Sequence, residues 1–272
     1  LKDNGDGTYE YTKYPSKDLY LGGITGSVNY IDAETVYATA TGDGFVNSSY
    51  SHWNTVHPAT TGNTVDYSSA HFRIHDYAIS LGKTIQHILR RGFLYFDTSG
   101  LSGTVSSVNL VTTVHPTWNS GSQLNSQYHL VKSTAASTLS VDSYNDFEGW
   151  RAGANAGFNG GTSADDDLTD YTTQQDWKNF DDNDVITTTL NSASINDVST
   201  SPFRIAMLQK ADFQNYLGNG NNGSSQGMYL YSTDQTGTSN DPYLSITLRW
   251  DTPRIKILSG QTKILSGNTI IK

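Results

Sequence analysis

The sequence predicts an all-β protein: a jelly-roll-type antiparallel β-sandwich with long loops and short β extensions at both termini. Three observations predict this class. Only 35% of the 272 residues are hydrophobic, and Tyr outnumbers Phe by 17 to 9, which suits a thin sandwich because Tyr packs its ring and keeps its hydroxyl hydrated. Most apolar residues recur with period two. The segments that carry them are short and lie between turns rich in Gly and Asn, as in sandwiches and barrels.

The expected strands follow one another along most of the chain. A turn at 3–7 (Asp-Asn-Gly-Asp-Gly) precedes a strand at 8–12, and Gly22-Gly23 forms a connection. A strand at 34–41 is stopped by Gly42-Asp43-Gly44. The remaining strands are expected at 71–74, 91–97, 105–114, 127–132, 185–190, 203–208, 228–232 and 243–250.

Two of these strands carry a sharper expectation, and helix is expected to be rare. Phe72 and Ile74 should share one face of their strand, and the dense run 93–96 (Phe-Leu-Tyr-Phe) predicts a buried strand. The segments 166–177 and 210–216 are each expected to hold a helical turn or two. The segment 144–161 is expected to be a long irregular loop.

The chain divides into a β extension at 1–30, a sandwich at 31–250 and a β-repeat tail at 251–272. In the tail, Lys-Ile-Leu-Ser-Gly at 256–260 recurs at 263–267, which predicts short strands or a hairpin. Such a piece is too small to fold alone, so it should pair with its own sandwich, a further domain or another subunit. The residues expected to make that assembly contact are Ile255, Ile257, Leu258, Ile264, Leu265 and Ile270.

Charge and composition argue against several classes of protein. The net charge is −9, and no basic run is longer than Arg90-Arg91, so a nucleic-acid partner is not expected. The absence of Cys excludes disulfides, thiol catalysis and Cys-ligated zinc. No stretch reaches the roughly 18 apolar residues of a membrane-spanning helix. The low charged content, 16%, with abundant Ser, Thr and Asn, fits an extracellular, cell-surface or virion protein.

Four segments resemble a known family. They are Arg-Gly-Phe-Leu-Tyr-Phe-Asp-Thr-Ser-Gly-Leu at 91–101, the strand 103–110, Tyr-Leu-Tyr-Ser-Thr-Asp at 229–234 and Asp-Pro-Tyr-Leu-Ser-Ile-Thr at 241–247. Through them the chain, over about residues 34–249, is similar to the disaggregatase-related repeat domain, also described as a carbohydrate-binding module attached to alginate lyases. The resemblance implies a β-sandwich of surface or virion-associated proteins. The loops 47–65 and 144–184 have no counterpart in the family pattern.

No catalytic residues are expected, and the chain is predicted not to be an enzyme. Gly-Ser-Ser-Gln-Gly at 223–227 matches G-x-S-x-G, but a nucleophile elbow needs a helix after it, and a strand is expected there. His71 and His75 resemble a metal pair. On a strand, four rises of about 3.3 Å hold them too far apart for one ion.

Two groups of residues are candidates for binding. Asp165, Asp166, Asp167 and Asp170 form an oxygen-rich loop that suits a structural Ca²⁺, although the EF-hand spacing is absent; no other cofactor is expected. A glycan patch is predicted at five loop positions, where aromatic faces would lie beneath a sugar: Tyr50, Trp53, Trp150, Asp176 and Trp177. The alternative is that these rings anchor the long loops on the sandwich.

The function expected from the sequence is that of a non-catalytic structural module of an extracellular assembly: a surface fibre, a filament or a virion appendage. Its partners would then be copies of itself, in a homo-oligomer, or other subunits. The alternative is a carbohydrate-binding module for a cell-surface or matrix polysaccharide.

Overall fold

The computed structural model describes most of the sandwich and small parts of both ends. The described residues are 2–3, 9–10, 30–81, 84–116, 127–149, 168–172, 175–176, 180–200, 202–213, 225–234, 237–250, 264–266 and 269–271.

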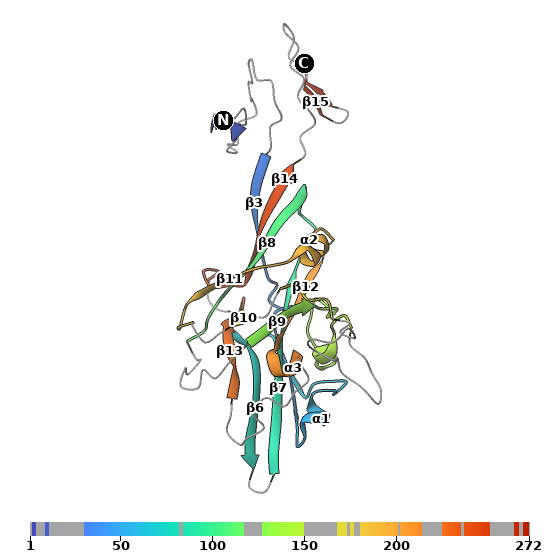
Figure 1. The fold of residues 1–272 in the computed structure, drawn as a ribbon, viewed down its shortest axis with the longest axis vertical. Coiled ribbons are helices and arrows are strands. Elements are labelled where there is room, and N and C mark those ends of the chain that lie inside the picture. The colour runs from blue at the N-terminus through green and yellow to red at the C-terminus, as the bar shows by residue number, and fades with distance from the viewer. Residues whose placement is uncertain are drawn as a thin grey trace.

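Two antiparallel sheets form the body of the protein, as Figure 1 shows. The smaller sheet has the order β11-β8-β14-β3, with β3 (Tyr30–Tyr37), β8 (Thr104–Thr113), β11 (Val185–Thr189) and β14 (Tyr243–Trp250). The larger sheet has the order β10-β9-β12-β7-β4-β5, and β6 and β13 branch from β7. Its strands are β4 (Gly44–Tyr50), β5 (Thr64–Asp66), β6 (His71–Leu81), β7 (Thr84–Phe96), β9 (Gln127–Lys132), β10 (Gln175–Asp176), β12 (Phe203–Gln209) and β13 (Ser225–Tyr231). The predicted all-β sandwich is therefore confirmed.

The longest strand, β7, organises the larger sheet. On one edge its residues 87–93 pair with β4. On the other edge, residues 84–90 pair with β6 and residues 92–96 pair with β12. Because β6 and β12 use successive parts of one edge, the sheet divides along β7, and this brings β6 and β13 close to the end of β8.

The main core fills the space between the two sheets. It takes buried residues from both, among them Phe72, Ile74, Leu94, Leu110 and Ile246. Phe72 and Ile74 are both fully buried in it, which confirms that they share one face of their strand. The helix α2 (Ser192–Val198) closes one side through Val198, and Asn191 caps it by accepting hydrogen bonds from the backbone N–H groups of Ala193 and Ser194.

A second core lies on the opposite face of the larger sheet. Phe93, Val131 and Leu208 belong to it, and each is next in sequence to a residue of the main core. Three short helical segments contribute to its cover: α1 (Trp53–Val56), the 3₁₀ helix η2 (Val141–Asn145) and α3 (Lys210–Phe213). Strands buried on both faces read as continuous apolar runs, and this explains the run at 93–96 and the sequence of β12.

The ends of the chain form separate small sheets. Tyr30 at the start of β3 pairs with Trp250 at the end of β14, so the chain enters and leaves the sandwich side by side (Figure 1). Near the ends, β1 (Lys2–Asp3) pairs with β2 (Tyr9–Glu10), and β15 (Ile264–Ser266) pairs with β16 (Thr269–Ile271). The short β extensions predicted at both termini are thereby confirmed; in the tail, the second copy of the repeat holds β15, and β16 follows that copy to complete a hairpin.

Two local expectations were wrong and one was right. The segment 166–177 holds the strand β10 in its described part, paired with β9, where a helical turn was expected. The expected loop 47–65 contains the end of β4, the helix α1 and the start of β5, because β4 and β5 pair there. The helical turn expected within 210–216 is present as α3.

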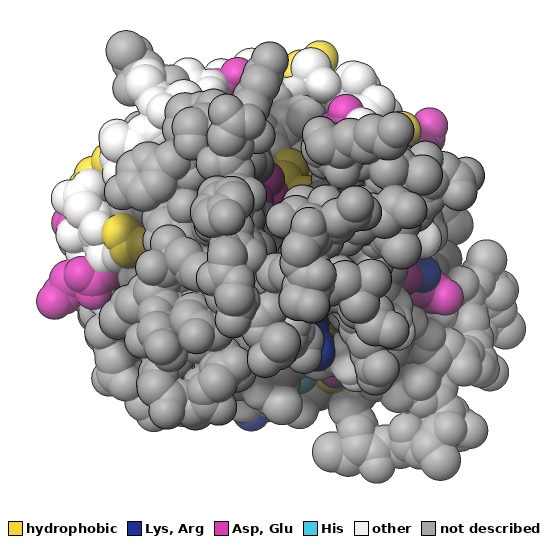
Figure 2. All heavy atoms as spheres, turned by 90° about the horizontal axis from the view of Figure 1, so that it is seen from above, with side chains coloured by type: hydrophobic (Ala, Val, Ile, Leu, Met, Phe, Trp, Pro, Cys, Tyr) yellow, Lys and Arg dark blue, Asp and Glu magenta, His cyan; other side chains and the backbone are white. Residues whose placement is uncertain are grey.

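On the face that Figure 2 shows, the acidic side chains of the described residues are dispersed. Seen along the long axis of the molecule, Asp and Glu show at several places around the rim, whereas Lys and Arg show at few (Figure 2). This distribution fits the net charge of −9 and the usual role of dispersed surface charge in solubility.

Candidate functional site

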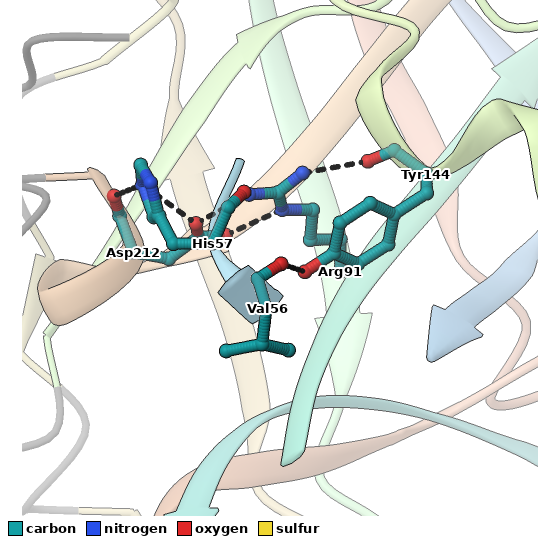
Figure 3. Close-up of polar contacts among 5 residues, drawn as sticks. All are labelled: Val56, His57, Arg91, Tyr144 and Asp212. Atoms are coloured by element: carbon teal, nitrogen blue, oxygen red, sulfur yellow. Dashed lines mark hydrogen bonds and ion pairs between the residues drawn. The ribbon is translucent and has the colours of Figure 1, made fainter. Parts of the chain in front are cut away.

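A buried ion pair lies at the centre of the second core. Arg91, on β7, is completely buried and makes a two-pronged contact with Asp212 of α3: Nε to Oδ2 at 2.8 Å and Nη2 to Oδ1 at 2.7 Å. Nη1 donates to the Tyr144 carbonyl at 2.9 Å, and Nη2 also donates to the His57 carbonyl at 3.0 Å (Figure 3). The guanidinium also lies 4.0 Å from the centre of the Tyr144 ring. We call Arg91, Asp212, His57 and Tyr144 the arginine centre.

The arginine centre joins all three covering segments to the sheet. Tyr144, from η2, donates its hydroxyl to the Val56 carbonyl at the end of α1, at 2.8 Å. His57 follows α1, and its Nε2 lies 3.0 Å from the Asp212 carbonyl oxygen. Burial lowers the pKa of His57 to about 4, so the ring is neutral at pH 7. A single arginine on β7 therefore fixes α1, η2 and α3.

This geometry supports a structural role for the centre. Arg91 and Asp212 are both fully buried, so the pair has no surface on which to meet a substrate. Burial is the largest influence on the pKa of Arg91 and lowers it, but the charge and hydrogen bonds of Asp212 and the nearby Tyr144 together raise it by more, so the net shift is upward and the ion pair stays charged. The one signal of this centre in the sequence is an arginine beside a dense apolar run, because its partner Asp212 is 121 residues away.

A second group of polar side chains lies on β6, β7 and β13 and is partly exposed. It contains two arginines, Arg73 and Arg90, and rings stacked beside them. We call it the basic–aromatic cluster, and its other members are His71, His75, Tyr77 and Tyr229. His75 is the most enclosed member, and burial, followed by the charges of Arg90 and Arg73, lowers its pKa to about 3.

The structure describes three of the five residues of the predicted glycan patch. Trp53 is only 6% exposed and stacks on His57 with ring centres 5.5 Å apart, so its expected place on an exposed patch was wrong. The ring anchors α1 on the second core, as in the alternative interpretation, and Tyr50 packs against the same core. Asp176 lies in β10 opposite Gln127. Trp150 and Trp177 lie outside the described residues.

The calcium candidates are only partly described. Asp165, Asp166 and Asp167 lie outside the described residues. Asp170 is described; its Oδ1 lies 3.7 Å from Nδ1 of His129, and its side chain is 39% exposed. In the described parts of the chain, no group of three or more His, Asp or Glu side chains is arranged to hold a metal ion. A structural Ca²⁺ therefore stays a prediction.

The two motifs that resemble catalytic or metal sites belong to strands. His71 and His75 lie on β6, as expected. The last three residues of the G-x-S-x-G match, Ser225 to Gly227, open the strand β13, so a strand follows where an elbow needs a helix. Gly227 itself has φ +156° and lies opposite His75 on β6. A Cβ on Gly227 would collide with the backbone carbonyl oxygen of Ile74, so this position requires glycine for packing.

We expect Gly227→Ala to destabilise the protein by about 2 kcal/mol or more, because the added methyl has no room and the backbone is strained for an L side chain. Urea unfolding of the full chain measures the effect. Gly100→Ala is the matched control, since nothing lies within 4 Å of a Cβ at that position. Equal stabilities for the two variants would contradict the packing role of Gly227.

The six residues predicted for assembly contacts fall in two groups. Ile264 and Leu265 lie in β15 and Ile270 lies in β16. Ile255, Ile257 and Leu258 lie outside the described residues.

Comparisons with protein-family models and with curated proteins identify no relative of this chain. No protein-family model matches the chain, and a search of curated proteins gives no match. The resemblance to the disaggregatase-related repeat domain stays a prediction. Among the described helices, none is both long enough and apolar enough to span a membrane.

Proposed function

We propose that this chain is a non-catalytic structural module of an extracellular assembly, such as a surface fibre, a filament or a virion appendage. On this proposal the module assembles through its C-terminal tail, with copies of itself or with other subunits. The short covering segments α1, η2 and α3 are held by a buried ion pair, which suits a domain that has to keep its shape.

The observation that carries the proposal is the isolated hairpin β15–β16. Within the described part of the chain, these two strands pair only with each other. Ile264 lies opposite Ile271, and Leu265 lies opposite Ile270 in the next rung. Neighbouring rungs belong to opposite faces of a sheet, so both faces of the hairpin have apolar positions. A two-stranded sheet is marginally stable alone, and a partner that covers it would stabilise it.

The path of the chain supports a module that projects from its assembly. Tyr30 and Trp250 are paired, so the two connections to the sandwich leave it together. The hairpin of β6 and β7 lies at the far end of the body from β15 (Figure 1). Assembly through the tail would therefore leave the β6–β7 end free.

The expected result is that the full chain forms an oligomer and that a double variant, Leu265→Asp with Ile270→Asp, is monomeric. Charges at this apolar rung would make a covered interface unfavourable. Native mass spectrometry and light scattering measure the state, with Thr269→Asp, in the same hairpin, as the matched control that should stay oligomeric. A full chain that is monomeric at its highest soluble concentration would contradict self-assembly.

Binding of a polysaccharide is the second candidate function. Its remaining support is the sequence expectation that Trp150 and Trp177 lie in loops, together with the partly exposed rings of Tyr77 and Tyr229 in the basic–aromatic cluster. Saturable retardation of the chain in gels that contain a polysaccharide, in the absence of other subunits, would favour this function over a purely structural one.

A further inference from the structure

Arg73 and Arg90 hold two positive charges close together in the basic–aromatic cluster. The Cζ atoms of both lie over the ring of Phe45, at 5.6 Å and 5.7 Å from its centre. Arg73 also lies 4.8 Å from the centre of the Tyr229 ring, and Arg90 lies 5.1 Å from that of Tyr77. Both arginines are partly exposed, so ligands in solution can reach them.

Every hydrogen bond of these two arginines within the described structure goes to a side chain that carries no negative charge. Arg73 contacts Nε2 of His71 through Nε at 3.3 Å and Nη2 at 3.2 Å. Arg90 contacts Nδ1 of His75 at 3.1 Å and donates to the Tyr77 hydroxyl at 3.1 Å, while its Nε is buried without a partner. Among the described residues, no carboxylate forms an ion pair with either arginine.

The neighbouring residue shows what the pair lacks. Arg91 is joined to Asp212 by two hydrogen bonds. Arg73 and Arg90 repel each other, and among the described residues their hydrogen bonds go to His and Tyr side chains without negative charge. The nearby Asp66 carboxylate raises the pKa of His71 and so opposes the stronger lowering by burial. That carboxylate already accepts hydrogen bonds from Ser68 and Ser69. In a chain with a net charge of −9, two adjacent arginines without a carboxylate partner in the described structure form a local site of opposite sign.

We propose that Arg73 and Arg90 form a binding site for an oxyanion, a carboxylate or sulfate group, supplied from outside the domain. A guanidinium is a planar fork that binds such groups through two parallel hydrogen bonds. An anion between the two forks would neutralise charges that burial makes unfavourable. The rings of Tyr77 and Tyr229 would flank it and contact the apolar part of a larger ligand. This site does not depend on assembly through the tail, because its residues all lie in the sandwich.

The test is a titration of the full chain with sodium sulfate, sodium acetate and sodium glucuronate at pH 7 and constant ionic strength, followed by calorimetry. We expect saturable binding of at least one of these anions. Tighter binding of sulfate identifies a sulfate-type group, and tighter binding of glucuronate than of acetate identifies a carboxylate carried on a ring. No saturable binding of any of the three would overturn the proposal.

Variants locate the site. Arg73→Gln and Arg90→Gln should each weaken the anion affinity at least tenfold, and Arg204→Gln, a partly buried arginine over Tyr95 on β12 and β7, should leave it unchanged. Arg73→Lys keeps the charge without the fork and should give an intermediate affinity. Circular dichroism confirms folding of each variant. An affinity retained within twofold in folded Arg73→Gln and Arg90→Gln chains would overturn the assignment.

Discussion

Arg91→Met is expected to lower the free energy of unfolding by about 3–5 kcal/mol, which is the usual cost of removing one partner of a buried ion pair. The substitution would leave the Asp212 carboxylate fully buried without its counter-charge. It would also remove the donors that now satisfy the carbonyls of Tyr144 and His57. Urea unfolding at pH 7 measures the loss.

The control for this variant is Arg204→Met, which removes another arginine from the larger sheet. Arg204 lies 5.5 Å from the centre of the Tyr95 ring and is partly exposed, so its loss should cost less than about 1 kcal/mol. In the double variant of Arg91→Met with Asp212→Asn, part of the loss should be recovered because the unpaired charge is gone. A stability of Arg91→Met equal to that of Arg204→Met would contradict the role assigned to the arginine centre.

For Arg91→Met we also predict which segments lose the most local stability. Because Arg91 fixes α1, η2 and α3 through His57, Tyr144 and Asp212, amide hydrogen exchange should accelerate most in these three segments. The main core lies on the other face of the sheet, so β8 and β14 should keep more of their protection.

Strands were predictable both where apolar and polar residues alternate, as in β14, and where the residues of a short run are buried on both faces, as in β9. The bounds predicted for β9 and β14 agree with the structure, at 127–132 and 243–250. The start of β7 was missed by seven residues, since the strand begins at Thr84 and was expected from Arg91. Its first half mixes exposed and partly exposed positions with buried ones, and the pairing with β6 extends it beyond the apolar run.

The second core could not be predicted, for two physical reasons. Its covering segments α1, η2 and α3 have only four or five residues each, which is too short to show a helical period. Its central contact joins Arg91 to a carboxylate 121 residues away, and sequence spacing carries no signal for such a pair. Trp53 was placed on the surface for the same reason: without the second core, a loop tryptophan has nothing to pack against.

The second large effect on stability is expected at Asp76, where substitution by Asn should stabilise the protein at neutral and alkaline pH. Its side chain lies on β6 between Gln226 of β13 and Leu89 of β7, and the residue is only 7% exposed. Burial, and secondarily the Asp212 charge, raises the pKa of Asp76 from 3.8 to about 7. The folded state therefore keeps the proton to a higher pH than the unfolded state does. The contribution of Asp76 to stability is fully present below pH 4 and is lost as the pH rises to about 7.

Asp76→Asn removes this loss because an amide does not ionise. We expect the variant to match the wild type near pH 4 and to exceed it by up to about 4 kcal/mol at pH 8, which is roughly three pKa units at about 1.4 kcal/mol each. Unfolding by urea at a series of pH values measures the difference. Asp32→Asn, at a partly exposed position of the edge strand β3, is the control and is unfolded at the same series of pH values.

His57 changes the pH dependence of stability in the opposite direction to Asp76. Its pKa falls from 6.5 to about 4 on folding, chiefly through burial, so its contribution is present above pH 6.5 and is lost as the pH falls to about 4. In the wild type, the gain from neutral His57 and the loss from Asp76 overlap between pH 4 and 6.5 and partly cancel. Asp76→Asn should therefore uncover a stability that rises with pH over that range. A flat difference between Asp76→Asn and the wild type from pH 4 to 8 would show that folding does not raise the pKa of Asp76.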